Sequence, residues 1–268
     1  MQLSEKQAKR LRTKYGDWAL VTGATSGIGK GIANQLAMVG FNLVITGRRK
    51  SLLAALTNDF AQYHNAEIVA ISGDLSQAEE VQRLLEETAL LPIGISILNA
   101  GFGTSGGFLK ADIATEANML DLNCRSLLLM THHFARQFAQ KKGGAIVLMS
   151  SMVAFQGVPN AANYAATKAY VQSLGEALAV ELRPQGIDVL CAAPGPVESE
   201  FAERANMRLG KAMQPQQVSV SILKAIGRKG TVLPGFMTKF LVFNLRLTPR
   251  WAKIRIMQKV MEGFTKHQ

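Results

Sequence analysis

Short apolar runs alternate along this chain with longer segments that carry apolar residues at helical spacing. Seven runs have strand length, are rich in β-branched residues and lack apolar–polar alternation, which is typical of strands buried on both faces of a parallel sheet. They cover residues 17–22, 41–46, 67–71, 94–98, 144–150, 187–192 and 230–233. The intervening segments predict helices over 28–39, 50–62, 76–90, 112–141, 160–183 and 215–227. This order predicts an α/β fold with a doubly wound parallel sheet.

No internal repeat, low-complexity tract or linker interrupts the pattern before about residue 234. From there, short apolar and basic segments are punctuated by Pro234, Gly235 and Pro249, which favours a boundary. We therefore expect one domain over 1–234, which holds the candidate site residues described below, and an extension over 235–268. An α/β domain of this length is common.

The sequence predicts a cytoplasmic protein. Cys124 and Cys191 show no CxxC spacing, which favours a reducing compartment. The first ten residues are charged, unlike a secretory signal, and no apolar run is long enough to span a bilayer. No set of metal ligands is predicted.

The charge of the chain, +11 at neutral pH, is concentrated at its two ends. Residues 1–14 carry five Lys or Arg against one Glu, and residues 228–268 carry nine against one, whereas 15–227 is nearly neutral. A nearly neutral body argues against a general nucleic-acid-binding surface, so no nucleic-acid partner is expected. The ends are predicted to be basic appendages that meet something anionic.

Residues 22–29 read Thr-Gly-Ala-Thr-Ser-Gly-Ile-Gly and join the first predicted strand to the first helix. Such glycines allow a tight turn and a close backbone approach to a pyrophosphate, which the free N–H groups at the helix start would hold. A glycine-rich turn without a ligand is the alternative, but the strand–turn–helix context favours a dinucleotide site. Its predicted residues are Thr22, Gly23, Ser26, Gly27, Ile28 and Gly29.

The second predicted strand runs into residues 46–50, which read Thr-Gly-Arg-Arg-Lys and hold no acid. A carboxylate at this place would bind the 2′-hydroxyl of NAD, whereas a guanidinium suits a 2′-phosphate. The sequence therefore favours NADP(H), with Arg48 on the phosphate and with Arg49 and Lys50 exposed. The alternative is that these charges only form a solvated cap on the helix at 51–62.

Two further segments follow strands at the same predicted sheet edge, where ligands of open α/β sheets bind. Asp74 can accept from the adenine amino group and Leu75 can supply backbone contacts, although Asp74 alone would fit a helix cap. Asn99, Ala100 and Gly101 end the fourth strand. Small residues there let the cofactor lie against the sheet, and Asn99 can brace the central strands.

Ser150 and Ser151 end the fifth strand, and Tyr164 and Lys168 follow one helical turn apart, on one helix face. A phenol is a poor base at neutral pH, but a neighbouring ammonium favours the phenolate. Tyrosine then becomes a usable acid–base group for interconverting hydroxyl and carbonyl, with a serine hydroxyl to orient the same oxygen. For an isolated Tyr-x-x-x-Lys a solvent-facing pair is the alternative; the strand-end serine favours catalysis.

Together these motifs resemble those of the short-chain dehydrogenase/reductase family, in its single-domain branch. The resemblance covers about residues 16–200, in the family's order and spacing, and implies a Rossmann-type core, a three-layer αβα sandwich. The first position of the family's Asn-Asn-Ala-Gly motif is Leu98 here. The resemblance rests on Thr22-Gly23, Gly27-Ile28-Gly29, Asp74-Leu75, Asn99-Ala100-Gly101, Asn123, Ser151, Tyr164, Lys168 and Pro194-Gly195.

The resemblance implies a catalytic set of Asn123, Ser151, Tyr164 and Lys168. Tyr164 would be the acid–base group and Ser151 would hold the substrate oxygen. Lys168 would lower the tyrosine pKa and bind the nicotinamide ribose. Asn123 would hold a water that links Lys168 to solvent, although by sequence alone a satisfied buried amide fits equally.

The family resemblance also implies that Pro194, Gly195 and Val197 cover the nicotinamide, with the Val197 backbone on its carboxamide. Ser199 stands where the family often has threonine. A homodimer or homotetramer through the helices at 112–141 and 160–183 is implied in the same way.

Apolar residues in the loops predicted near the reaction centre suggest a hydrophobic substrate, such as a fatty-acyl, steroid-like or other lipid ketone or alcohol. Ordinary loop packing is the alternative. The segment 198–214 is predicted to be a lid over the substrate. The loop residues are Phe102, Phe108, Met152, Phe155, Val158 and Pro159.

The extension over 236–264 combines apolar residues, partly at helical spacing, with interleaved basic ones. Such a segment can lie on an anionic membrane surface as a peripheral contact, or pack on its own domain or on another subunit. The apolar residues are Phe236, Met237, Phe240, Leu241, Phe243, Leu245, Trp251, Ile254, Met257, Val260, Met261 and Phe264, and the basic ones are Arg250, Lys253, Lys259 and Lys266.

The sequence thus predicts an NADP(H)-dependent carbonyl reductase or alcohol dehydrogenase that transfers a hydride between nicotinamide and substrate. The alternative from another class is a non-catalytic dinucleotide-binding sensor or scaffold held at a membrane surface. A sensor has no need of four catalytic residue types at catalytic spacing, which favours the enzyme. An enoyl reductase or epimerase is a third possibility, which the spacing from Ser151 to Tyr164 disfavours.

Overall fold

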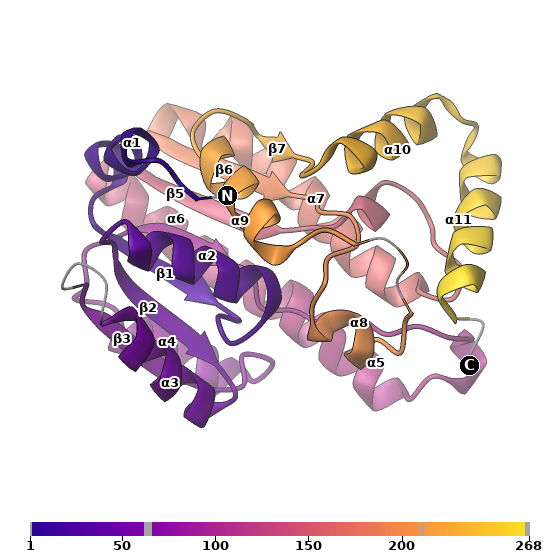
Figure 1. The fold of residues 1–268 in the computed structure, drawn as a ribbon, viewed down its shortest axis with the longest axis horizontal. Helices are drawn as coiled ribbons and strands as arrows, with labels where there is room; N and C mark the ends of the chain where they lie inside the picture. The colour runs from indigo at the N-terminus through magenta and orange to yellow at the C-terminus, as the bar shows by residue number, and fades with distance from the viewer. Residues whose placement is uncertain (1, 62–65, 209, 211, 266–268) are drawn as a thin grey trace.

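A computed structural model describes residues 2–61, 66–208, 210 and 212–265 of the chain. It contains one seven-stranded parallel sheet in the order β3-β2-β1-β4-β5-β6-β7, which confirms the predicted fold class (Figure 1). Each strand lies within two residues of its predicted range. The strands are β1 (Trp18–Thr22), β2 (Asn42–Gly47), β3 (Ile68–Ser72), β4 (Ile93–Leu98), β5 (Gly144–Met149), β6 (Ile187–Ala192) and β7 (Thr231–Val232).

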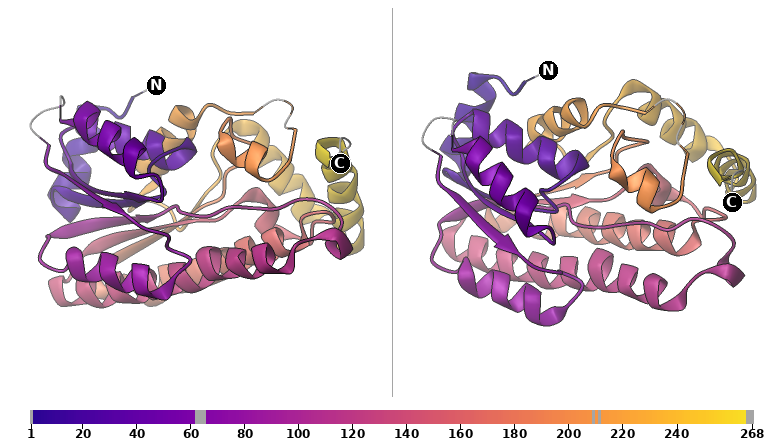
Figure 2. Two further views of the ribbon diagram at one scale, coloured as in Figure 1. Left: turned by 90° about the horizontal axis from the view of Figure 1, so that it is seen from below. Right: turned by 60° about the horizontal axis from the view of Figure 1, so that its bottom comes forward.

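Helices cover both faces of the sheet, which gives the three layers visible edge-on in Figure 2. One layer contains α1 (Glu5–Tyr15), α2 (Gly27–Met38), α3 (Lys50–Phe60) and α9 (Pro215–Ala225), and the other contains α4 (Ala78–Glu87), α6 (Leu127–Lys141) and α7 (Ala162–Glu181). Successive strand side chains point to opposite faces. Leu43 and Ile45 therefore lie in the first core, between the sheet and the layer of α1, α2, α3 and α9. Val44 between them lies in the second core, on the other face of the sheet.

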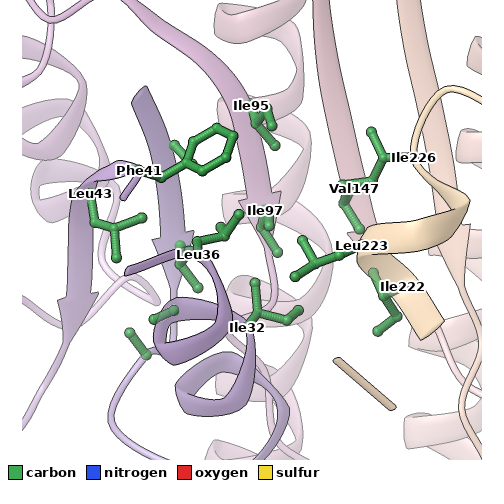
Figure 3. Close-up of a cluster of buried hydrophobic side chains, with 14 of the residues drawn as sticks. Ile32, Leu36, Phe41, Leu43, Ile95, Ile97, Val147, Ile222, Leu223 and Ile226 are labelled. Carbon is green, nitrogen blue, oxygen red and sulfur yellow. The ribbon is translucent and has the colours of Figure 1, made fainter. Parts of the chain in front are cut away.

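The first core shows why both faces of the strands must be apolar. Ile32 and Leu36 of α2 and Leu223 of α9 pack over the central strands beside Ile95 and Ile97, and all five are fully buried (Figure 3). Burying each such side chain contributes about 1.5–3 kcal/mol. The continuous apolar runs in the sequence are a direct consequence of this two-sided burial.

The basic N-terminus is not an appendage, contrary to the sequence-based expectation. It forms α1, which buries Ala8, Leu11 and Tyr15 in the core. Arg10 donates to the carbonyl of Ile226 at 2.7 Å, just past the end of α9. A cation at a helix C-terminus is favourable because it meets unsatisfied carbonyls and the negative dipole end.

The helix predicted over 112–141 is divided by a π-helical turn. α5 (Ile113–Leu120) passes into the wide turn η2 (Asp121–Ser126) and then into α6. Turns of this kind are rare and often occur at functional sites. Asn123, a predicted site residue, lies within it.

The C-terminal extension forms two helices, α10 (Phe236–Leu247) and α11 (Arg250–Thr265), at one end of the molecule (Figure 1). Leu245, Met257 and Met261 are buried in a cluster that also contains Tyr164. The extension therefore packs on its own domain, one of the alternatives left open by the sequence, although the boundary at 235 stays a prediction. Lys266 and the predicted helix end at 62 lie outside the described residues, and so do positions 209 and 211 of the expected lid.

No helix in the described part of the chain combines the length and apolarity needed to cross a bilayer.

Candidate active site

A cavity of about 330 Å³ opens at the carboxyl ends of the strands, where the order of the sheet reverses between β1 and β4. This is the position at which open α/β sheets bind ligands. Most of the predicted site residues lie in its wall; Thr22, Gly29 and Asn123 do not. Those in the wall are Gly23, Ser26, Gly27, Ile28, Arg48, Asp74, Leu75, Asn99, Ala100, Gly101, Ser151, Tyr164, Lys168, Pro194, Gly195, Val197 and Ser199.

The glycine turn is held open by a polar brace behind it. The fully buried Thr22 hydroxyl accepts from the backbone N–H groups of Asn99 and Ala100, both at 2.9 Å. The Asn99 amide donates to the carbonyls of Thr22 (3.0 Å) and Gly23 (3.3 Å). Thr22 thus positions the turn from behind, and Asn99 braces the central strands as predicted.

Gly29 is buried and lies against this brace. A Cβ at this position would be 2.3 Å from the carbonyl oxygen of Gly23 and 2.5 Å from the Asn99 amide nitrogen. Gly23 and Gly27 have φ of 67° and 53°, which L side chains rarely adopt. No side chain caps α2, so its first N–H groups are available for an anion. The turn therefore fits a dinucleotide pyrophosphate.

The three cations after β2 have different environments. Arg48 is exposed in the cavity wall and has no hydrogen bond or ion pair with the residues that the structure describes. Arg49, which was expected to be exposed, is partly buried: it donates to the Thr25 hydroxyl at 3.2 Å and pairs with Glu200 at 2.9 Å. Of the three cations after β2, Arg48 is thus the one that lines the cavity without a partner among the described residues, and so is available for a phosphate.

Asp74 shapes the turn beyond β3. Its Oδ1 accepts from the backbone N–H and the hydroxyl of Ser76, at 3.1 and 3.0 Å. The next helix, α4, starts only at Ala78, so Asp74 is not its N-cap. Asp74 and Leu75 both lie in the cavity wall, where the cofactor-binding prediction places them.

Ser151 and Tyr164 meet at the centre of the cavity. Ser151 is the second residue after β5 and caps a short 3-10 helix, η3 (Met152–Phe155), while Tyr164 lies in the first turn of α7. Phe201 packs on the tyrosine, with ring centres 5.4 Å apart. Gly103 makes room for both rings, because a Cβ there would be 2.8 Å from Phe201 and 2.9 Å from Tyr164. The sequence analysis did not single out Gly103.

The proton affinity of Tyr164 differs from the expectation. Burial raises its pKa to about 12, against which the hydrogen bond with Ser151 acts only in part. The pKa of this phenol therefore lies above its ordinary value, and not below it as the sequence analysis expected. At neutral pH the phenol keeps its proton, which suits a proton donor.

Lys168 lies one turn after Tyr164 on α7. Its Nζ is 5.9 Å from the centre of the Tyr164 ring and donates a hydrogen bond to the Met149 carbonyl at 2.8 Å. Burial lowers its pKa to about 8. Desolvation disfavours the ammonium, and the interaction with Cys124 does not offset this cost.

Asn123 is buried behind the cavity, in the π-helical turn. Its amide donates to the Phe102 carbonyl at 2.8 Å and to the Thr167 hydroxyl at 3.1 Å, and its oxygen accepts from the Phe102 N–H at 3.1 Å. This is the satisfied buried amide that the sequence left as an alternative. Asn123 lies close to Lys168, because both side chains flank Gly101. A Cβ added to Gly101 would be 2.8 Å from Asn123 Oδ1 and 3.4 Å from Lys168 Nζ. The water-holding role stays a prediction.

The loop after β6 lines the cavity with residues 194–197. Met152 donates its N–H to the Pro194 carbonyl at 2.9 Å, and the Ser199 hydroxyl caps α8 (Glu200–Arg204) by accepting from Phe201 N–H. An added Cβ on Gly195 would be 2.6 Å from the Thr238 hydroxyl of α10. The C-terminal extension thus contacts the loop predicted to cover the nicotinamide, a link that the sequence analysis missed.

The apolar wall of the cavity comes only in part from the predicted loops. Phe102 and Met152 lie in it, but Phe108 is mostly exposed, and Phe155, Val158 and Pro159 line a separate groove. The C-terminal helices supply more of it, which the sequence pattern of the extension could have suggested, and η2, η3 and the segment from α8 to Met207 supply the remainder. These additional apolar residues include Leu122, Val153, Phe201, Met207, Leu241, Met257, Val260, Met261 and Phe264.

The expected lid over 198–214 lies at the cavity. Its helix α8 contributes Phe201 and Arg204 to the wall, and Met207 follows. The pair between Glu200 and Arg49 ties this helix to the segment after β2. Opening and closing of this segment stay a prediction.

Comparison with known proteins gives three findings. The sequence pattern of the family described as short chain dehydrogenase matches residues 17–209. A 7beta-hydroxysteroid dehydrogenase of Clostridium sardiniense is 31% identical over 232 residues, covering 85% of this chain and 89% of that protein. The solved structure of a short-chain dehydrogenase from Sphingobium yanoikuyae in complex with NADPH has a TM-score of 0.77 at 28% identity, covering 85% of this chain and 92% of the other.

A further solved structure comes from a study of 7beta-hydroxysteroid dehydrogenase stereoselectivity. It has a TM-score of 0.85 at 27% identity, and the match covers 92% of this chain and 98% of the other. The architecture and the sequence pattern therefore point to the same group of proteins.

Proposed function

Because this chain belongs to the short-chain dehydrogenase family, and so is an oxidoreductase that binds a nicotinamide dinucleotide and acts on CH–OH or C=O groups, we propose that it is an NADPH-dependent reductase of a bulky apolar ketone. The observation that carries the proposal is the meeting of Ser151, Tyr164 and Lys168 with the glycine turn in one cavity whose remaining wall is mostly apolar.

In the proposed reaction, bound NADPH supplies the hydride to the carbonyl carbon. Ser151 and Tyr164 hold the carbonyl oxygen by hydrogen bonds, and Tyr164 gives its proton to that oxygen as negative charge develops. The Lys168 ammonium stabilises the resulting phenolate. A tyrosine that keeps its proton at neutral pH can serve as the proton donor in the reduction.

Turnover tests the proposal: purified protein is given NADPH with a panel of steroid-like, acyl-type and small ketones, and loss of NADPH absorbance is followed. Reduction of at least one bulky ketone is expected. Tight NADPH binding with no turnover of any ketone or alcohol would instead favour the non-catalytic sensor.

The pH dependence should report Lys168. Its ammonium is present below a pKa of about 8 and is lost above it, so kcat/KM for reduction should be level near neutral pH. It should then fall by about tenfold per pH unit above about 8, because the phenolate loses its counter-ion. A profile measured with saturating NADPH checks this, and an unchanged rate through about pH 10 would contradict the role of Lys168.

The cofactor preference should depend on Arg48. Arg48→Ala should weaken NADPH binding by about tenfold to a hundredfold, because a charge-assisted contact with the 2′-phosphate is lost, and should leave NADH binding unchanged. Quenching of intrinsic fluorescence measures both affinities. Lys50→Ala, which removes a neighbouring exposed cation, is the matched control. Equal loss for both cofactors would show that Arg48 does not select the phosphate.

The substrate is proposed to be a polycyclic, hydroxysteroid-like ketone, which the apolar wall and the likeness to 7beta-hydroxysteroid dehydrogenase support. Met261→Ser should raise KM for a steroid ketone by about tenfold, since a polar group replaces a buried apolar contact. KM for a small ketone should stay the same. A parallel rise for both would indicate damage to the whole cavity.

A homodimer through α6 and α7 is also part of the proposal. Leu128 and Leu129 of α6 and Tyr170 and Val180 of α7 are exposed large apolar or aromatic residues on the two helices expected at the interface. Light scattering measures the mass, and a monomer at all concentrations would contradict the dimer.

Both cysteines are free, which supports the cytoplasmic, reducing compartment proposed here.

A further inference from the structure

The two faces of α10 differ in their surroundings. Thr238, Val242 and Leu245 are buried against the domain. Phe236 and Phe243 lie on the opposite side and are 79% and 63% exposed. Phe240 and Leu247 continue this stripe, since residues at i, i+4, i+7 and i+11 share one face of a helix. Trp251, at the start of α11, is also 67% exposed.

An exposed stripe of this kind is unusual on a soluble surface and marks an interaction site. The rings of Phe236 and Phe240 stack on each other, with centres 6.3 Å apart, but the stripe does not enter any apolar cluster of the described residues. Packing on the domain, already accomplished by the other face of α10, does not account for it.

The charged residues of α10 and of the first part of α11 are all positive. Lys239 and Arg246 lie on α10, and Arg250, Lys253 and Arg255 lie on α11. No Asp or Glu occurs between Glu203 and Glu262. A second copy of this face would bring like charges together, which disfavours self-association here. Duplex nucleic acid would match the charge but would leave the aromatic side chains unused.

We propose that the exposed face of α10 and the start of α11 dock on the surface of an anionic lipid bilayer. Aromatic and aliphatic side chains would enter the interface while Lys and Arg meet the anionic headgroups. The same helices reach the cavity: Leu241 and Val260 line it and are partly exposed. An apolar substrate could then pass from the bilayer to the cavity without crossing water, a consequence that rests on the proposed function.

Vesicle flotation with the full chain tests the docking without any measurement of turnover. Vesicles of phosphatidylcholine alone are compared with vesicles of phosphatidylcholine and phosphatidylglycerol. Binding is expected only to the second, and it should weaken as salt rises. No binding, or equal binding to both, would overturn the proposal.

Two variants separate the apolar and charged contributions. The triple substitution Phe236→Ser, Phe243→Ser and Trp251→Ser should lower vesicle partitioning by about a hundredfold, and Lys239→Glu with Arg250→Glu by about tenfold or more. None of these residues lines the cavity, so turnover of a soluble ketone should persist.

The matched control reverses two charges at the other end of the molecule. Lys6 and Lys9 are exposed on α1, which lies far from α11 in Figures 1 and 2, so Lys6→Glu with Lys9→Glu should bind vesicles as the wild type does. An equal loss in this control would mean that net charge alone drives binding. Binding to duplex DNA that survives the triple substitution, or a dimer that the triple substitution dissociates, would assign the face to another partner.

Discussion

Tyr164→Phe should lower kcat/KM for ketone reduction by about a hundredfold to ten-thousandfold, the range over which a positioned general acid contributes. The substitution removes only the hydroxyl, so the ring keeps its packing on Phe201 and its place in the buried cluster with Met257 and Met261. NADPH affinity should therefore change little. Stopped-flow measurement of hydride transfer, together with fluorescence titration of NADPH, separates the two effects.

Tyr170→Phe is the control, because Tyr170 lies on the same helix but does not line the cavity. Its kcat/KM should equal that of the wild type. If Tyr164→Phe kept most of the activity, the proton would come from another group. The Ser151 hydroxyl and water would then be the candidates.

Gly29→Ala should damage cofactor binding without touching a catalytic side chain. The added methyl would lie 2.3 Å from the Gly23 carbonyl oxygen and 2.5 Å from the Asn99 amide nitrogen. It must displace the glycine turn or the brace behind it, at a cost of about 1–3 kcal/mol of folding stability for overpacking. NADPH affinity should fall by more than about tenfold, because the backbone no longer approaches the pyrophosphate closely. Thermal unfolding and NADPH titration measure the two effects.

The control for this variant is Gly107→Ala, since a Cβ at Gly107 would meet nothing within 4 Å. It should keep both stability and affinity. Added NADPH should raise the unfolding temperature of Gly107→Ala more than that of Gly29→Ala, because a ligand that binds the folded protein more tightly stabilises it more. An unchanged affinity in Gly29→Ala would mean that the turn does not hold the cofactor.

The strands and the cofactor turn could be predicted from sequence because their signals are local. A strand buried on both faces has to be apolar throughout, and a tight turn before a helix has to be built from glycine. The roles of Thr22 and Gly29 could not be separated from those of Gly23 and Gly27 in this way. The tertiary structure decides which of these residues line the cavity and which brace the turn from behind. Thr22, for example, is held by Asn99, which lies 77 residues after it at the end of the neighbouring strand.

The chemical state of the catalytic groups was also beyond the sequence. Spacing placed Tyr164 and Lys168 on one helix face, but a pKa depends on burial and on every neighbour. Burial outweighs the hydrogen bond with Ser151, so the pKa of the phenol rises, and burial also lowers the pKa of the Lys168 ammonium. Arg49 is a similar case, since its partner Glu200 is distant in the sequence.

By itself the sequence determined the parallel αβα architecture, the glycine turn after the first strand and the order of Ser151, Tyr164 and Lys168, because each follows from local periodicity or short spacing. Only the tertiary structure decided what the two basic ends do. In α1, Arg10 donates to a carbonyl at the end of the neighbouring helix α9, whereas Met257 and Met261 of α11 line the cavity. An amphipathic helix shows that it has an apolar face, but the surface that covers this face is set by contacts far apart along the chain.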